Sequence, residues 1–136
     1  MSRTIGTSPT AELANTMLKK AVAKLGSEVN PIIHSYRGGH YRWPEWIEIT
    51  KREALIRSMS KKGCSPDNSA CEGFFGRIKN EMFYNRDWHA VSLAKFEQIL
   101  DEYLNWYAQK RIKVSLGGLS PVEFRKRNGI HIDYPA

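Results

Sequence analysis

Residues 64–84 read CSPDNSACEGFFGRIKNEMFY and combine a turn, a helix start and an apolar helical stripe. The Pro66-Asp67-Asn68 segment predicts the turn, because proline fixes φ and the Asp and Asn side chains bond to nearby backbone. Ser69, followed by Glu72 three residues later, is the pattern of a capping box at a helix N-terminus. Five apolar residues recur at helical spacing: Phe74, Phe75, Ile78, Met82 and Phe83. We therefore expect an amphipathic helix that starts at about Ser69.

Two charged side chains stand out on this helix. Glu72 and Lys79 lie seven residues apart, which is two helical turns, so both are expected to project from one face. Their ordinary interpretation is electrostatic, because a carboxylate at a helix N-terminus is favoured by the helix dipole and an exposed lysine is simply solvated. The alternative interpretation is that they belong to a functional site, and the rest of the chain must decide between the two.

The composition is that of a basic globular protein. The 136 residues are a length typical of one domain with its own core, and 41% hydrophobic with 26% charged residues is ordinary for a soluble protein. A net charge of +7 favours a polyanionic partner such as nucleic acid. Cys64 and Cys71 have no second pair and no histidine at ligand spacing, which argues against a zinc site or a disulfide framework. The sequence shows no membrane-spanning run and no signal peptide, so we expect a cytoplasmic protein.

The remaining chain predicts helices around two short strands. The expected elements are a helix over 11–25 between Thr10 and Gly26 as caps, a strand over 32–36, a helix over 44–54, a strand over 55–59, the helix from Ser69, a helix over 92–110, a turn over 112–118 and a short helix from Ser120. Residues 1–10 are expected to be disordered, 11–127 to form the core and 128–136 a tail. A short buried strand that opens into the Arg37-Gly38-Gly39 loop is how an α/β sheet presents a site. Two strands are few for such a sheet.

Several motifs resemble a known family in the right order. They are HSYRGGHY (34–41), SMSKKG (58–63), DNSACEGFF (67–75), IKNE (78–81), WY (106–107), KR (110–111) and LSPVEF (119–124). These segments resemble the integrase-type catalytic core, of the DDE type, of bacterial insertion-sequence transposases of the IS-three type. The resemblance covers about residues 11–127. It implies an α/β, ribonuclease-H-like fold that is truncated here and lacks the first strands of its sheet.

The resemblance also implies a metal site. In that family three carboxylates hold two divalent cations, Mg²⁺ or Mn²⁺, which stabilise the entering and leaving oxygens of a DNA phosphodiester. Glu72 matches the third carboxylate, and Lys79 matches the basic residue that contacts DNA. The second aspartate of the family falls on Tyr36, and the thirty-five residues between Tyr36 and Glu72 agree with the family spacing.

Two of the three family carboxylates are therefore absent from this chain. A tyrosine phenol is neutral at pH 7 and is a poor Mg²⁺ ligand. No aspartate precedes Asp67, and we interpret Asp67 as a turn residue rather than a replacement ligand. From this donor set we expect that the chain binds no metal ion and is catalytically inactive.

The expected partner is DNA, as transposon ends or target DNA. The residues expected to contact phosphate are Lys79, Lys61, Lys62, Arg37, His40, Arg77, Lys110 and Arg111, supported by Lys113, Arg125, Lys126 and Arg127. His40 either reaches phosphate or caps a turn, whereas His34 is interpreted as a packing histidine. The aromatic residues Trp43, Trp46, Phe74, Phe75, Trp88 and Trp106 are interpreted as core or oligomer-interface residues rather than base-stacking platforms.

The function that the resemblance implies is transposition by metal-dependent DNA cleavage and strand transfer, in a segment that has lost that activity. The alternative is a DNA-binding or oligomerising module that modulates an intact transposase, because such a role needs only the basic surface and the helices. An exposed sheet edge favours self-association or association with the full-length enzyme. Either role implies a cytoplasmic, nucleoid-associated bacterial protein.

Overall fold

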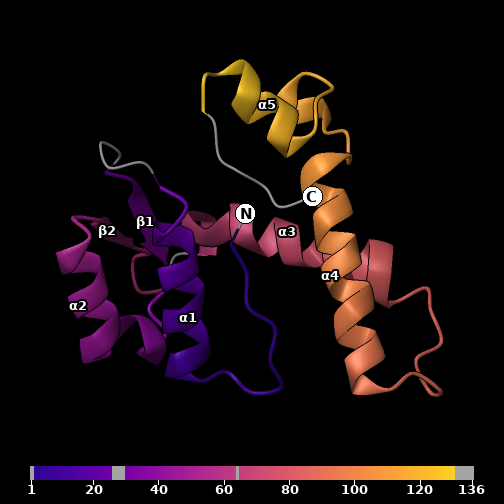
Figure 1. The fold of residues 1–136 in the computed structure, drawn as a ribbon, viewed down its shortest axis with the longest axis horizontal. Coiled ribbons are helices and arrows are strands. Elements are labelled where there is room, and N and C mark those ends of the chain that lie inside the picture. The colour runs from indigo at the N-terminus through magenta and orange to yellow at the C-terminus, as the bar shows by residue number, and fades with distance from the viewer. Residues whose placement is uncertain (1, 26–29, 64, 131–136) are drawn as a thin grey trace. The chain divides into compact units, whose positions relative to one another are not determined.

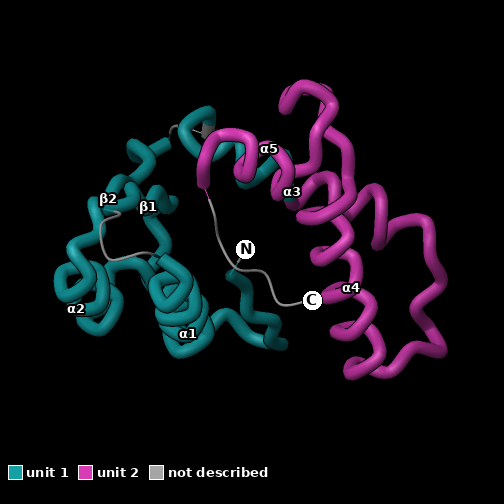
Figure 2. Tube along the Cα trace, turned by 45° about the horizontal axis from the view of Figure 1, so that its top comes forward, with its two compact units in different colours: residues 1–74 teal, residues 75–136 magenta. Residues whose placement is uncertain are grey.

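The computed structural model describes residues 2–25, 30–63 and 65–130. Its regular elements are the helices α1 (Ala11–Val22), α2 (Pro44–Arg52), α3 (Ser69–Ile78), α4 (Leu93–Gln109) and α5 (Pro121–Arg127) and the strands β1 (Ile32–Ser35) and β2 (Ile56–Met59) (Figure 1). The chain divides into two compact units, residues 1–74 and 75–136 (Figure 2). The sequence indicated no internal boundary, because this one falls inside the continuous helix α3. Gly26, Cys64 and the tail beyond Ile130 lie outside the described residues.

Unit 1 contains a small parallel sheet. β1 pairs with β2 in the register that places Ile32 opposite Ile56 and Ser35 opposite Met59. Parallel strands require a crossover connection, and here a short 3₁₀ turn (Gly39–Arg42) and α2 provide it. The predicted α/β class with two short strands is therefore confirmed within the part of the chain that the structure describes.

The core of unit 1 lies where α1, α2 and β1 meet. It is formed by Leu18, Trp46, Ile49 and Leu55, with Ile33 of β1 packed against it. Local signals set the helix starts. The Thr10 hydroxyl accepts the Leu13 amide at 3.1 Å at the start of α1, and Pro44 opens α2.

The N-terminal residues lie along α1. Residues 2–10 contain neither a helix nor a strand. The Ser2 hydroxyl nevertheless donates to the Met17 carbonyl, and the Thr4 hydroxyl to the Leu13 carbonyl, each at 2.9 Å. The disorder expected over 1–10 stays a prediction, and no composition pattern could have indicated these two bonds.

Unit 2 is helical. Among its described residues, the buried hydrophobic side chains are Met82, Leu104, Tyr107, Ala108 and Val122, and Ser120 is also buried. Ser92 caps α4, as predicted, by accepting the Lys95 amide at 3.3 Å. Gly117 and Gly118 have φ of 68° and 78° and form the predicted turn, because glycine adopts these values without strain. No helix in the described ranges of either unit is long and apolar enough to cross a membrane.

The opening stretch differs from its prediction in two respects. The structure begins α3 at Ser69, so Ser69 is the first helical residue rather than the cap before it. A capping box is present at Ser120 and Glu123, at the start of α5. After Ile78 the helix continues as a π-helical segment, Lys79–Phe83. The wider π turn shifts the helical phase, so Met82 is buried whereas Phe83 stays exposed.

Candidate functional site

Tyr36, which the sequence resemblance assigns to the family's second carboxylate position, belongs to a chain of packed rings. It follows the last residue of β1 and is 49% exposed. Its ring meets Tyr41 edge-to-face at 5.3 Å between centroids, and Tyr41 meets Trp46 at 4.8 Å. We call Tyr36, Tyr41 and Trp46 the aromatic ladder, because it links the loop after β1 to the core. Burial, followed by the nearby Tyr36 and Cys71 groups, raises the pKa of Tyr41, which keeps that phenol neutral.

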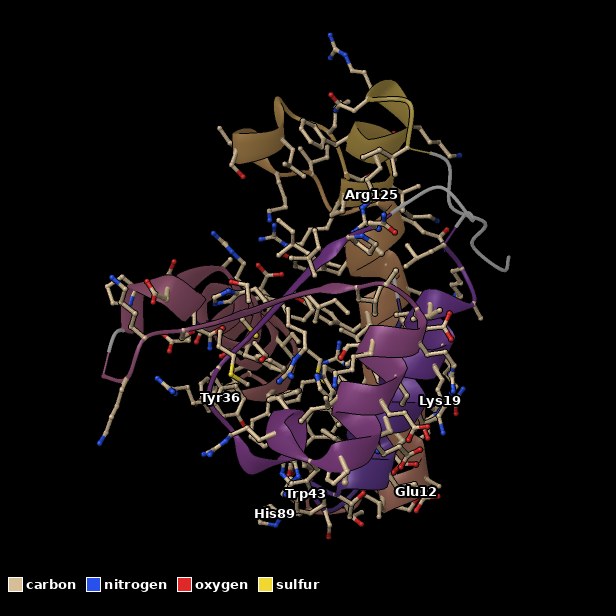
Figure 3. The ribbon with its side chains drawn as sticks, turned by 90° about the vertical axis from the view of Figure 1, so that its left-hand side faces the viewer. Glu12, Lys19, Tyr36, Trp43, His89 and Arg125 are labelled. Atoms are coloured by element: carbon tan, nitrogen blue, oxygen red, sulfur yellow. The ribbon has the colours of Figure 1, made fainter. Side chains whose placement is uncertain are left out.

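The first glycine of the loop makes room for a ring, whereas the second lies in ordinary contact with one. A Cβ on Gly38 would lie 2.7 Å from ring atoms Cε2 and Cζ of Tyr36, so the tyrosine ring closely approaches the glycine backbone. A Cβ on Gly39 would lie 3.7 Å from Nε1 of Trp43, which is 47% exposed. Figure 3 labels Tyr36 and Trp43 among the side chains of this region. The Gly-rich loop thus serves aromatic packing.

The metal-site residues predicted from the sequence do not complete a site. Glu72 is exposed in the first turn of α3, and Asp67 accepts the Lys61 backbone amide at 2.9 Å, which organises the connection to α3. Within residues 2–25, 30–63 and 65–130, no three His, Cys, Asp or Glu side chains gather where they could hold a metal ion. At the positions that the resemblance assigns, the donors are one carboxylate and one tyrosine phenol, and because a phenol is a poor Mg²⁺ ligand these do not fit a two-metal site.

Unit 2 holds an ion-pair cluster that the sequence interpretation missed. The Arg111 guanidinium donates to both carboxylate oxygens of Glu81, with Nε to Oε2 at 2.9 Å. The Tyr103 hydroxyl donates to Oε2 at 2.8 Å. These bonds, the one from Arg111 first, lower the pKa of Glu81 to about 2, while burial and the Glu81 charge raise the pKa of Tyr103. Glu81 and Arg111 are thirty residues apart, so no local spacing indicated their contact.

An open pocket of about 1030 Å³ adjoins this cluster. Trp106, which is 45% exposed, lines it together with Arg86, Lys110 and the carboxylate-bearing Glu102. The Glu102 carboxylate accepts a hydrogen bond from the Gln98 side-chain amide at 2.8 Å, and no cation of the described residues pairs with it. The pocket therefore carries mixed charge.

The histidine predictions have separate outcomes. His34 bonds through Nδ1 to the Ser58 hydroxyl at 2.9 Å and through Nε2 to the Ser60 hydroxyl at 3.1 Å. The side chain is exposed rather than packed in the core, but its two bonds tie β1 to β2 and to the residue after it. His40 meets Trp43 edge-to-face at 5.3 Å. Its role toward phosphate stays a prediction.

Comparison with known proteins agrees with the motifs. Residues 72–128 match the family described as integrase core domain. A probable transposase for insertion sequence element IS1353 from Shigella flexneri is 58% identical over 126 residues, which is 93% of this chain and 24% of that protein. The chain is homologous to insertion-sequence transposases with an integrase core.

Two further transposase relatives support this assignment. The putative transposase InsK for insertion sequence element IS150 from Escherichia coli is 34% identical over 93% of this chain and 44% of its own length. An uncharacterized transposase-like protein from Haemophilus influenzae is 37% identical over 89% of this chain and 55% of its own length. The chain thus spans from about a quarter to somewhat over half of the length of these relatives.

The basic residues expected to contact DNA occur in both units of the chain. Arg37, Lys61 and Lys62 are exposed in unit 1. Arg77, Lys79 and Lys110 are exposed in unit 2, with Lys79 as the first residue of the π-helical segment. Arg111 differs from the others, because its guanidinium is occupied by Glu81 and its side chain is mostly buried. We therefore describe Arg111 first as part of the ion-pair cluster.

Proposed function

We propose that the chain binds insertion-sequence DNA as part of a transposase core, and that its own residues do not support metal-dependent cleavage. We further propose that the chain belongs to a ribonuclease-H-like fold, which the integrase-core match over residues 72–128 supports. The observation that carries the proposal is the packing of Tyr36. At the position that the resemblance assigns to a family carboxylate, a tyrosine ring lies against Gly38 and Tyr41.

DNA binding is supported by charge. A net charge of +7 and exposed lysines favour contact with phosphates, because each neutralised phosphate releases a condensed counterion. Such binding needs no metal ion. It is therefore compatible with a donor set that consists of Glu72 and the Tyr36 phenol.

Charge reversal at Lys79 and at Lys62 tests the DNA-binding role. Lys79→Glu and Lys62→Glu are each expected to weaken binding to a transposon-end duplex and to reduce the slope of log K against log salt by about 0.9 per lost phosphate contact. Fluorescence anisotropy across a salt series measures both quantities. The control is Lys20→Glu, an exposed lysine of α1 outside the expected contact set. If Lys20→Glu weakens binding as much as the other two, net charge alone explains the affinity and the assigned contacts are wrong.

The same samples test for cleavage. The wild-type chain and Tyr36→Asp are both expected to leave a transposon-end duplex intact with Mg²⁺ or Mn²⁺, because the substitution supplies a second carboxylate but no third and removes a packed ring. Denaturing gel electrophoresis of end-labelled DNA measures nicking. Metal-dependent nicking by the wild-type chain would contradict the proposed inactivity.

A second candidate function, association with a transposase or with another copy, is favoured by the open face of the sheet. Ile32 and Ile56 lie opposite each other and are 67% and 54% exposed. Exposed strands and apolar side chains of this kind promote association. Light scattering separates the candidates, since a chain that stays monomeric with and without DNA is inconsistent with an oligomerising role.

A further inference from the structure

We propose that the loop from Tyr36 to Trp43 is a stacking site for unpaired DNA bases. This inference rests on the DNA binding proposed above and adds the form of DNA and the side chains that hold it. It also differs from the sequence interpretation of Trp43 as a core or interface residue. The reason is that the structure leaves about half of Trp43 and half of Tyr36 exposed on one eight-residue segment.

The two rings are held from the protein side. Tyr36 lies against Gly38 and is fixed by the edge-to-face contact with Tyr41, which continues to the buried Trp46. Trp43 adjoins Gly39 and is fixed by the contact with His40. Rings that are already ordered lose little conformational entropy when a planar ligand stacks on them. The loop therefore presents two prearranged aromatic surfaces.

The loop is also basic throughout. The segment YRGGHYRW, residues 36–43, contains Arg37 and Arg42 and no carboxylate, and both arginines are exposed. Arg57 of β2 donates to the Tyr41 carbonyl at 2.9 Å, which brings a third guanidinium to the loop. Proteins bind single-stranded nucleic acid with cations that contact the phosphate backbone, interleaved with aromatic rings that stack on the bases.

Unpaired bases fit this loop better than a duplex or an apolar protein surface. In a duplex both faces of each base are covered by neighbouring bases, so a protein ring can stack only where the strand is open. An apolar partner would have to cover the exposed Arg37 and Arg42 without pairing their charges, which is costly. The pocket at Trp106 exposes a similar indole, but its lining mixes cations with the carboxylate of Glu102, whereas the loop carries no carboxylate.

The test compares single-stranded and duplex oligonucleotides of the same sequence by fluorescence anisotropy. Trp43→Leu and Tyr36→Leu keep apolar bulk but remove the ring, and each is expected to weaken single-strand binding about tenfold while duplex binding changes less than about twofold. The salt slope should stay unchanged, because no charge is removed. Trp43→Phe and Tyr36→Phe are expected to retain most of the affinity.

Two further variants and a stability measurement show whether a loss of affinity arises from stacking. Arg42→Gln is expected to reduce the salt slope for a single strand by about 0.7, the value for one lost phosphate contact. Trp106→Leu removes a similarly exposed tryptophan from unit 2 and is expected to leave single-strand affinity unchanged. Thermal unfolding of each variant identifies the Leu variants that have lost stability. For those positions the affinity of the Phe variant is compared with that of the wild-type chain.

Several results would overturn the inference. Equal losses for single strands and duplexes in Trp43→Leu, or an equal loss in Trp106→Leu, would show that the rings do not stack on bases. A changed oligomeric state with unchanged DNA affinity would assign the loop to a contact between copies. If the wild-type chain binds DNA but the ring variants weaken single-strand and duplex binding equally, the stacking site is wrong and the proposed DNA-binding function stands. If it binds no DNA, the proposed function itself fails.

Discussion

Trp46→Ala is expected to lower the free energy of unfolding of unit 1 by about 3–5 kcal/mol. Trp46 is 2% exposed, contributes to the core with Leu18, Ile49 and Leu55, and forms the buried end of the aromatic ladder. Its removal leaves a cavity between α1 and α2 and takes away the ring that supports Tyr41. Because a domain is stable by only about 5–15 kcal/mol, this loss is a large share of the total.

The matched control is Trp43→Ala, three residues earlier in the chain. Trp43 is 47% exposed, so its truncation removes little buried surface and is expected to cost less than about 1 kcal/mol. Hydrogen exchange measured by mass spectrometry resolves unit 1 from unit 2, which a single melting curve does not. Equal loss of protection in the two variants would mean that Trp46 does not anchor the core.

The second large effect is expected at Glu81. Its folded-state pKa of about 2 lies below the ordinary value of 4.5, because Arg111 and then Tyr103 bind the ionised form. A lowered carboxylate pKa stabilises the folded state above pH 4.5, and this stabilisation is lost as the pH falls from 4.5 toward 2. Because the carboxylate retains contact with water, which screens its charge, we expect the pKa shift to contribute only about 1–2 kcal/mol to the free energy of unfolding.

Glu81→Gln should therefore destabilise unit 2 at pH 7 by about 1–2 kcal/mol and flatten its stability profile between pH 4.5 and 2. Denaturant titrations at a series of pH values measure both effects. The control is Glu97→Gln on α4, a glutamate that forms no ion pair within the described part of unit 2, which is expected to change stability by less than about 0.5 kcal/mol. If the free energy of unfolding falls as steeply between pH 4.5 and 2 in Glu81→Gln as in the wild-type chain, Glu81 is not the group that causes the acid destabilisation.

A double-mutant cycle identifies the partner. Arg111→Gln alone leaves the Glu81 carboxylate without its main donor, so the double variant is expected to be hardly less stable than either single variant. Simple addition of the two single losses would mean that the residues act independently. The cycle also shows how much of any DNA-binding defect in Arg111 variants arises from the ion pair.

Several elements follow from signals within a few residues. Thr10, Pro44 and Ser92 mark helix starts, and Gly117-Gly118 marks a turn, because caps and turns satisfy or shape the backbone close to themselves. The start of α3 was displaced by one residue and the π-helical segment was missed. Both depend on how the helix packs rather than on which residues favour a helix.

The amino-acid sequence by itself determines the charge of the chain, the presence of Glu72 and the tyrosine at position 36, and these limit the metal chemistry that the chain can support. Only the tertiary structure decides that Tyr36 lies over Gly38 at the end of the aromatic ladder and that Arg111 binds Glu81. Such contacts join residues that are close in space because of the path of the chain. A side chain's type is set locally, whereas its partner depends on the whole fold.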